Sequence, residues 1–213
     1  MKRKLTIALA LALLSAGSLQ AQSSTDLGTW SSIQIIKSWP KTYAMMRLEH
    51  RSFDKISQTE CAFAMAGAGY KFTPWLKGDL SYEYWHIPVS ANPTTHKGVA
   101  CLTGTLKEGA LAFSLREKYE QAFNVGGSAS STLRSRIRAQ YAVEQTAFTP
   151  YIMYEFFNGF GGTGWVRSLH YAGTEIKLSQ HHGLDLFYMF HLYPKGGEVA
   201  SCHLLGVGYV LSL

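Results

Sequence analysis

The sequence has 213 residues, of which 46% are hydrophobic, 13% are aromatic and only 16% are charged. Ordinary soluble domains carry about 25% charged residues, and no later run approaches the roughly 18 apolar residues that a transmembrane helix needs. The formal charge of +6 falls to +3 when residues 1–21, which hold three basic and no acidic residues, are left out. This small remaining charge disfavours a nucleic-acid-binding protein.

The first segment has the pattern of a secretory signal peptide. Lys2, Arg3 and Lys4 precede the apolar run LTIALALALL (5–14), and SAGSLQA then supplies small and polar residues before a cleavage site after Ala21. The apolar run is too short for a membrane anchor. We therefore predict a cleaved signal peptide at 1–21 and an exported chain of one domain at 22–213.

Beyond this segment, the chain alternates between apolar and polar residues in short stretches separated by turn residues. Such alternation is typical of β-strands, and no stretch has the pattern of a capped amphipathic helix. The predicted strands lie near residues 28–37, 42–52, 61–72, 76–87, 96–105, 110–122, 132–144, 149–157, 165–178, 183–192 and 202–213.

Exported amphipathic strands rich in aromatic residues indicate an outer-membrane β-barrel. The connections SWPKT, FTPW, LKEG, TAFTP and SQHHG are short, whereas FDKISQTE, IPVSANPTTH, NVGGSASS, NGFGGTG and PKGGEVAS are longer. We predict an all-β, antiparallel transmembrane barrel of 10–12 strands with short periplasmic turns and longer external loops. Because bacterial barrels normally have an even number of strands, we expect ten or twelve, with 28–37 not a full strand or with two strands merged elsewhere.

The stretch TLRSRIRAQYAVE (132–144) places Arg134, Arg136 and Arg138 on one face of a strand. Arginines that face lipid would each cost about 2–4 kcal/mol at the midplane, so we expect the row to face the lumen. Other strands offer similar polar faces. The predicted lumen-lining residues are Arg47, Glu49, Arg51, Glu83, Arg116, Lys118, Glu120, Arg134, Arg136, Arg138, Glu155 and Glu175.

Two interpretations of this charged face remain open. The arginines are either held by carboxylates in an ion-paired interior without a path through it, or they form a ladder that attracts anionic solutes. The small net charge and the many acidic residues favour the ion-paired interior.

Several stretches resemble a known family. MRLEHRS (46–52), SLREKYEQAF (114–123) and LRSRIRAQY (133–141) are similar to its charged strands, and PYIMYEFF (150–157) and GTEIKLSQHHGLDLFYMF (173–190) are similar to its C-terminal half. The family comprises the outer-membrane proteins described as domain of unknown function 2490 (DUF2490). The resemblance, from about Trp30 to Leu213, implies an outer-membrane β-barrel and supplies no catalytic residues.

Other motifs do not point to catalysis or to a cofactor. GFGGTG (159–164) has glycines spaced as in a dinucleotide-binding loop, but an alternating segment follows it where that fold needs a helix. His181 and His182 lie in a turn and point to opposite faces, with no serine nucleophile motif and no third metal ligand nearby. We predict no cofactor and no metal.

Three cysteines leave an odd thiol in an exported chain. Cys61, Cys101 and Cys202 each follow a long connection, which places them near one rim. Either one disulfide forms, with Cys61 and Cys101 as its candidate pair, or all three stay free thiols.

The predicted function is therefore that of an outer-membrane barrel without enzymatic activity, either structural or a narrow, charged conduit for small anionic solutes. Alternatives are a membrane-embedded enzyme acting on lipid or surface glycan, and a secreted lipocalin-like carrier with its apolar faces inside. Expected partners are outer-membrane lipid and, during biogenesis, periplasmic chaperones and the barrel-assembly machinery. Nucleic acid is not expected, and the oligomeric state is left open.

Overall fold

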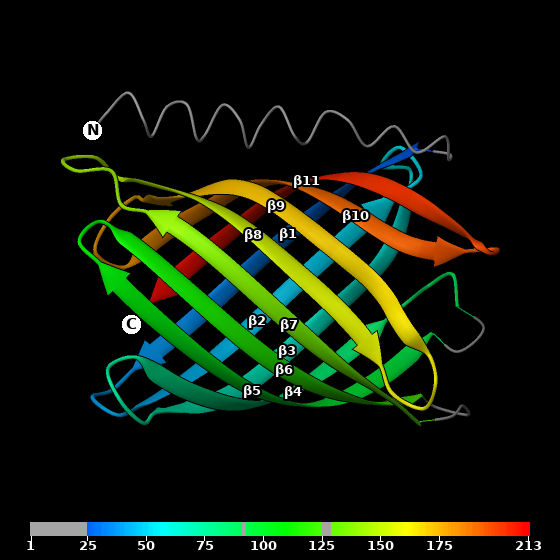
Figure 1. The fold of residues 1–213 in the computed structure, drawn as a ribbon, viewed down its shortest axis with the longest axis horizontal. Coiled ribbons are helices and arrows are strands. Elements are labelled where there is room, and N and C mark those ends of the chain that lie inside the picture. The colour runs from blue at the N-terminus through cyan, green and yellow to red at the C-terminus, as the bar shows by residue number, and fades with distance from the viewer. Residues whose placement is uncertain (1–24, 91–92, 125–128) are drawn as a thin grey trace.

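A computed structural model describes residues 25–90, 93–124 and 129–213, and it shows one closed β-barrel (Figure 1). The described residues form eleven strands. They are β1 (Thr25–Ser38), β2 (Thr42–Phe53), β3 (Gln58–Lys71), β4 (Leu76–His86), β5 (Thr94–Glu108), β6 (Leu111–Asn124), β7 (Ala129–Tyr141), β8 (Phe148–Gly159), β9 (Gly164–Lys177), β10 (His182–Lys195) and β11 (Glu198–Ser212). The all-β barrel is confirmed, and the predicted signal peptide lies outside the described residues.

The expectation of an even strand number is wrong for the described residues, because β1 is a full strand and closes the barrel against β11. Every other pair is antiparallel, whereas β1 and β11 run in the same direction, from Thr25 beside Ser201 to Ile36 beside Ser212. An odd number of up-and-down strands leaves the first and last strands pointing the same way, so the closing pair must be parallel. In Figure 1 the blue and red arrows accordingly point to the same end.

The two ends of the barrel carry different connections (Figure 1). We call the end with connections 39–41, 72–75, 109–110, 142–147 and 178–181, where the C-terminus lies, the turn end, and the opposite end the loop end. The longest connection joins His86 to Thr94 at the loop end. The predicted loops NGFGGTG and PKGGEVAS are shorter than expected and comprise only residues 160–163 and 196–197. The difference in loop length is smaller than predicted, because extending the strands pairs backbone groups that a loop would leave unpaired.

The strand faces follow the alternation of the sequence. Large apolar side chains point outward, as in Leu48, which is 61% exposed, and Leu80, which is 69% exposed. Charged residues of the same strands, such as Glu49 and Glu83, are buried inside. A barrel with an apolar outer surface and a polar interior is the arrangement that a bilayer requires.

No helix among the described residues is long and apolar enough to cross a membrane.

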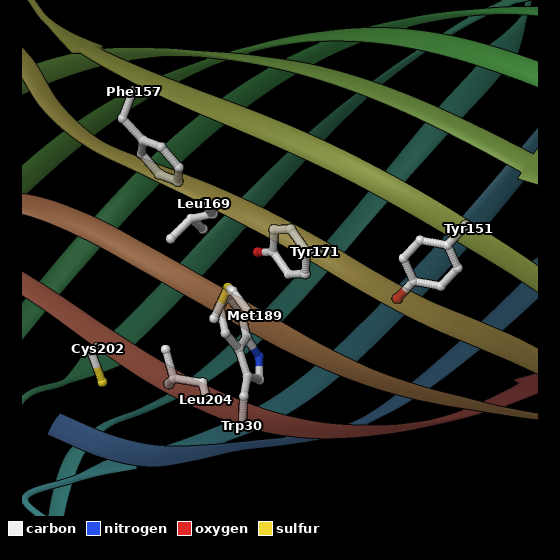
Figure 2. Close-up of a cluster of buried hydrophobic side chains, with 8 residues drawn as sticks. All are labelled: Trp30, Tyr151, Phe157, Leu169, Tyr171, Met189, Cys202 and Leu204. Carbon is white, nitrogen blue, oxygen red and sulfur yellow. The ribbon is translucent and has the colours of Figure 1, made fainter. Parts of the chain in front are cut away.

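Part of the interior is apolar. Side chains from β1 and from β8 to β11 form a buried cluster (Figure 2), which we call the apolar cluster: Trp30, Tyr151, Phe157, Leu169, Tyr171, Met189, Cys202 and Leu204. Phe187 packs against this cluster and lies over Gly206 of the paired strand, where an added Cβ would come within 2.0 Å of the ring. Glycine at 206 therefore makes room for an inward aromatic ring.

Candidate functional site

The structure places all of the predicted lumen-lining residues on inner faces, where they line two cavities of the barrel interior. They come from β2 (Arg47, Glu49 and Arg51), β4 (Glu83), β6 (Arg116, Lys118 and Glu120), β7 (Arg134, Arg136 and Arg138), β8 (Glu155) and β9 (Glu175).

The arginine row of β7 is only partly neutralised. Arg134 contacts Glu120 at 2.5 Å and Glu155 at 3.1 Å, and Arg138 contacts Glu175 at 2.7 Å. Arg136 forms no ion pair with any described residue, and its buried Nε lacks a hydrogen-bond partner there. The row therefore combines both interpretations, with two arginines held by carboxylates and one that is not.

A continuous network of charged residues crosses the interior. Glu120 contacts Lys118 at 2.9 Å and Arg134 at 2.5 Å. Lys118 also contacts Glu83 at 2.8 Å, and Glu83 in turn accepts a hydrogen bond of 2.8 Å from the indole of Trp85. Since β6 and β4 are separated by β5, the Lys118–Glu83 contact reaches past a neighbouring strand.

A second group of side chains, centred on Arg51 of β2 and Trp30 of β1, also extends into the interior of the barrel. Arg51 donates from Nε to Glu49 at 2.7 Å, and its guanidinium lies 3.6 Å from the ring centroid of Trp30 and 5.0 Å from that of Trp85. Such stacking satisfies the faces of a buried guanidinium that ion pairs leave open. Trp30, Arg51, Trp85 and Arg134 line both interior cavities, so they separate one cavity from the other. We call these four residues the partition.

The cavity on the turn-end side of the partition is large and basic. It has a volume of about 890 Å³ and extends to Lys71, Lys77 and Lys177 at the turn end. Its lining includes ten basic and six acidic residues. This space, which we call the vestibule, has the size of a small-molecule site and an electrostatic preference for anions.

The cavity on the loop-end side is small. It has a volume of about 30 Å³ and is lined by residues of the apolar cluster together with charged residues such as Glu60, Lys97 and Arg167. This volume holds about two water molecules, so side chains leave little free space directly beyond the partition.

Sequence reasoning missed the residues that close the interior. The inner faces of β10 and β11 carry Met189 and Leu204, which are 1% and 3% exposed. Because the outer faces of these strands are apolar as well, alternation could not distinguish them from lipid-facing residues. Lys97, which lies near the start of the predicted strand 96–105 and contacts Glu120 at 3.4 Å, was also missed.

The candidate disulfide is wrong, because all three cysteines are free thiols. Ala62, next to Cys61, pairs with His86 on β4, whereas Cys101 pairs with Asp79 of the same strand. The two cysteines thus lie more than about 20 Å apart along the strands, far beyond the Cα separation of a disulfide. Cys101 lies in the middle of β5 and lines the vestibule, not a rim.

The glycine-rich motif GFGGTG and the histidines of the turn SQHHG lie in connections between strands or at their ends. Residues 160–163 connect β8 to β9, and β9 begins directly at Gly164, so GFGGTG is a loop without a following helix. His181 contacts the carbonyl of Ser212 at 2.7 Å, and His182 contacts the Tyr209 hydroxyl. Among the described residues, no His, Cys, Asp or Glu side chains group as metal ligands.

Glu117 of β6 is an acidic residue that lies on the outer face. It accepts a hydrogen bond of 2.7 Å from Ser135 on β7, and it lines an outward groove together with Leu80, Leu102 and Tyr119. The Ser135 hydroxyl thus replaces one of the hydrogen bonds that the Glu117 carboxylate would receive from water.

Fold and site together define a porin-like β-barrel with an apolar exterior and a charged, partitioned lumen. The sequence profile of the family described as "Protein of unknown function (DUF2490)" matches residues 27–198, and the chain belongs to this family. Among solved structures, the chain is similar to the one entitled "NanC porin structure in rhombohedral crystal form", with a TM-score of 0.51, 11% identity, and coverage of 78% of this chain and 86% of that chain. No curated protein sequence matches the chain.

Proposed function

We propose that the protein is a non-enzymatic, integral outer-membrane barrel that takes small anionic solutes into its lumen from the turn end. The porin-like fold and the apolar outer surface support the location. Export by the predicted signal peptide, contact with outer-membrane lipid, and folding by periplasmic chaperones and the barrel-assembly machinery belong to the same proposal.

The observation that carries the proposal is the vestibule. Its excess of basic residues creates a positive potential in a space with low-dielectric walls, and such a space concentrates anions. Rings and rows of arginine or lysine are the usual means by which pores select anions. A carrier with an apolar interior would need the opposite arrangement of faces.

The partition sets the resting state of this conduit. Arg134 and Arg51 are both held by carboxylates, and Leu169, Met189 and Leu204 of the apolar cluster line the small cavity beyond them. An anion that crosses must therefore replace Glu120 or Glu155 as the partner of Arg134, and we expect a small conductance that opens rarely.

A second candidate is a purely structural barrel, which the ion pairs favour. The contacts of Glu155 with Arg116 at 2.6 Å and with Arg134 at 3.1 Å are those of a folding network and require no solute. In that case the arginines stabilise the barrel without any transport.

Single-channel recording of the refolded protein distinguishes the two candidates. We expect rare, anion-selective openings from the wild type, and loss of this selectivity when Arg134, Arg136 and Arg138 are all replaced by Gln. Thermal unfolding of the same variant serves as the control for folding. A wild-type barrel that neither conducts nor binds anions, and that loses only stability in the triple variant, would overturn the proposal in favour of a structural role.

A further inference from the structure

Arg136 is the member of the arginine row that the network of ion pairs leaves out. In the strand register it lies beside Glu155 of β8, the nearest acidic neighbour across the sheet. Both oxygens of Glu155 are already engaged, Oε1 with Arg116 at 2.6 Å and Oε2 with Arg134 at 3.1 Å. Each oxygen of Glu155 thus has another arginine as its ion-pair partner, and Glu155 forms no ion pair with Arg136.

The other neighbours of Arg136 increase the positive charge around it. Arg116 lies directly beside it on β6, and Arg134 and Arg138 lie two residues away on the same face of β7. Glu175 of β9, another acidic residue of the vestibule, contacts Arg138 at 2.7 Å. A half-buried guanidinium among three others is unfavourable unless an anion accompanies it.

The surroundings of Arg136 leave room for such an anion. Arg136 lines the vestibule together with Arg116 and Arg138, but it does not line the small cavity beyond the partition. An anion can thus reach it from the turn end without disturbing the partition. The volume of about 890 Å³ exceeds what a single small ion needs and admits a small organic molecule.

We propose that Arg136 is the principal ligand of an anion site at the inner end of the vestibule, with Arg116 and Arg138 on either side. The inference rests on the proposed function and names its solute class, which is a small molecule that presents two coplanar oxygens, as a carboxylate does. The planar fork of a guanidinium binds such a group through two parallel hydrogen bonds, which a spherical ion such as chloride cannot accept.

The proposal makes an unusual prediction about stability. Replacing Arg136 by Gln removes a positive charge that lies beside Arg116 and forms no ion pair with a described acid, so the ligand-free barrel should become more stable at low salt. Replacing Arg134 by Gln removes a partner of two carboxylates and should have the opposite effect.

The test uses the full barrel refolded in lipid vesicles, with acetate, sulfate and chloride compared at equal ionic strength. Acetate should raise the unfolding temperature of the wild type in a saturable manner, sulfate should do so to a similar degree, and chloride much less. Arg136→Gln should weaken acetate binding about tenfold or more, since it removes charge-assisted bonds. Arg136→Lys should retain part of the affinity because it keeps the charge without the fork.

Lys77→Gln is the matched control, since it removes one positive charge from the same vestibule at the turn end. Unchanged acetate affinity in Arg136→Gln, or equal losses in Arg136→Gln and Lys77→Gln, would overturn the site. So would a loss of ligand-free stability in Arg136→Gln as large as that in Arg134→Gln. If wild-type barrels still conduct anions selectively in that case, the site alone fails, whereas a wild type that neither binds nor conducts refutes the proposed function as well.

Discussion

Glu155 is the acidic residue on which the interior depends most. It is 2% exposed and is the ion-pair partner of both Arg116 and Arg134. Glu155→Gln would leave Arg116 without an acidic partner among the described residues and would remove the negative charge beside Arg136. Because breaking a buried ion pair from one side costs about 3–5 kcal/mol, and two pairs are broken here, we expect a loss of about 4–5 kcal/mol in the free energy of unfolding.

Glu175→Gln provides the matched comparison. Glu175 contacts Arg138 at 2.7 Å, but its side chain is 47% exposed. An exposed ion pair is worth at most about 1 kcal/mol, so this variant should lose no more than that amount. Arg134→Gln should fall between the two, at about 3 kcal/mol, because Glu120 keeps its contacts with Lys118 and Lys97.

Urea-induced unfolding of the barrel in lipid vesicles, followed by tryptophan fluorescence, measures all three variants. The predicted order of stability loss is Glu155→Gln, then Arg134→Gln, then Glu175→Gln. Losses below about 1 kcal/mol for both Glu155→Gln and Glu175→Gln would show that the lumen is hydrated enough to screen its charges. The argument from buried ion pairs would then be refuted.

Three further predictions concern the strand faces, a glycine and a thiol. Leu186→Arg on the outer face of β10 should destabilise the membrane-inserted barrel by about 2–4 kcal/mol, whereas Asp185→Asn on the inner face should have a far smaller effect. Equal losses of folded barrel in both variants, measured by gel mobility, would reject the assignment of faces. Gly206→Val should lose about 1–3 kcal/mol in the same urea assay, since its Cβ would meet the Phe187 ring, and wild-type stability would contradict that packing. With Cys101 as the sole cysteine, a membrane-impermeant thiol reagent should label it only after the outer membrane is permeabilised, because it lines the vestibule; labelling of intact cells would place the turn end outside.

Alternation along single strands predicted the faces well but could not predict how the barrel closes. The period of two placed Arg134, Arg136 and Arg138 together, and the structure keeps them on the inner face of β7. The parallel closure of β1 on β11 depends on the parity of the strands, which local patterns do not encode.

The ion pairs that cross the lumen could not be predicted from the sequence either. Lys118 and Glu83 are 35 positions apart and meet because the curvature of the barrel brings β6 and β4 to face one space. Met189 escaped notice for a different reason. It lies on the inner face of β10, where two apolar residues, Phe187 and Met189, lie between Asp185 and His191, so polarity along this face did not single it out.

The arginine row contains a paired member, Arg134, and an unpaired member, Arg136, and their positions separate the barrier to passage from the affinity for anions. The two oxygens of Glu155 contact Arg116 and Arg134, and neither forms an ion pair with Arg136. Arg134 belongs to the partition, whereas Arg136 faces only the vestibule. Charge neutralisation thus maintains the barrier while the unbalanced charge remains on the accessible side. It follows that Arg134→Gln should alter leakage through the barrel and Arg136→Gln should alter anion affinity, and variants that change both properties together would contradict this separation.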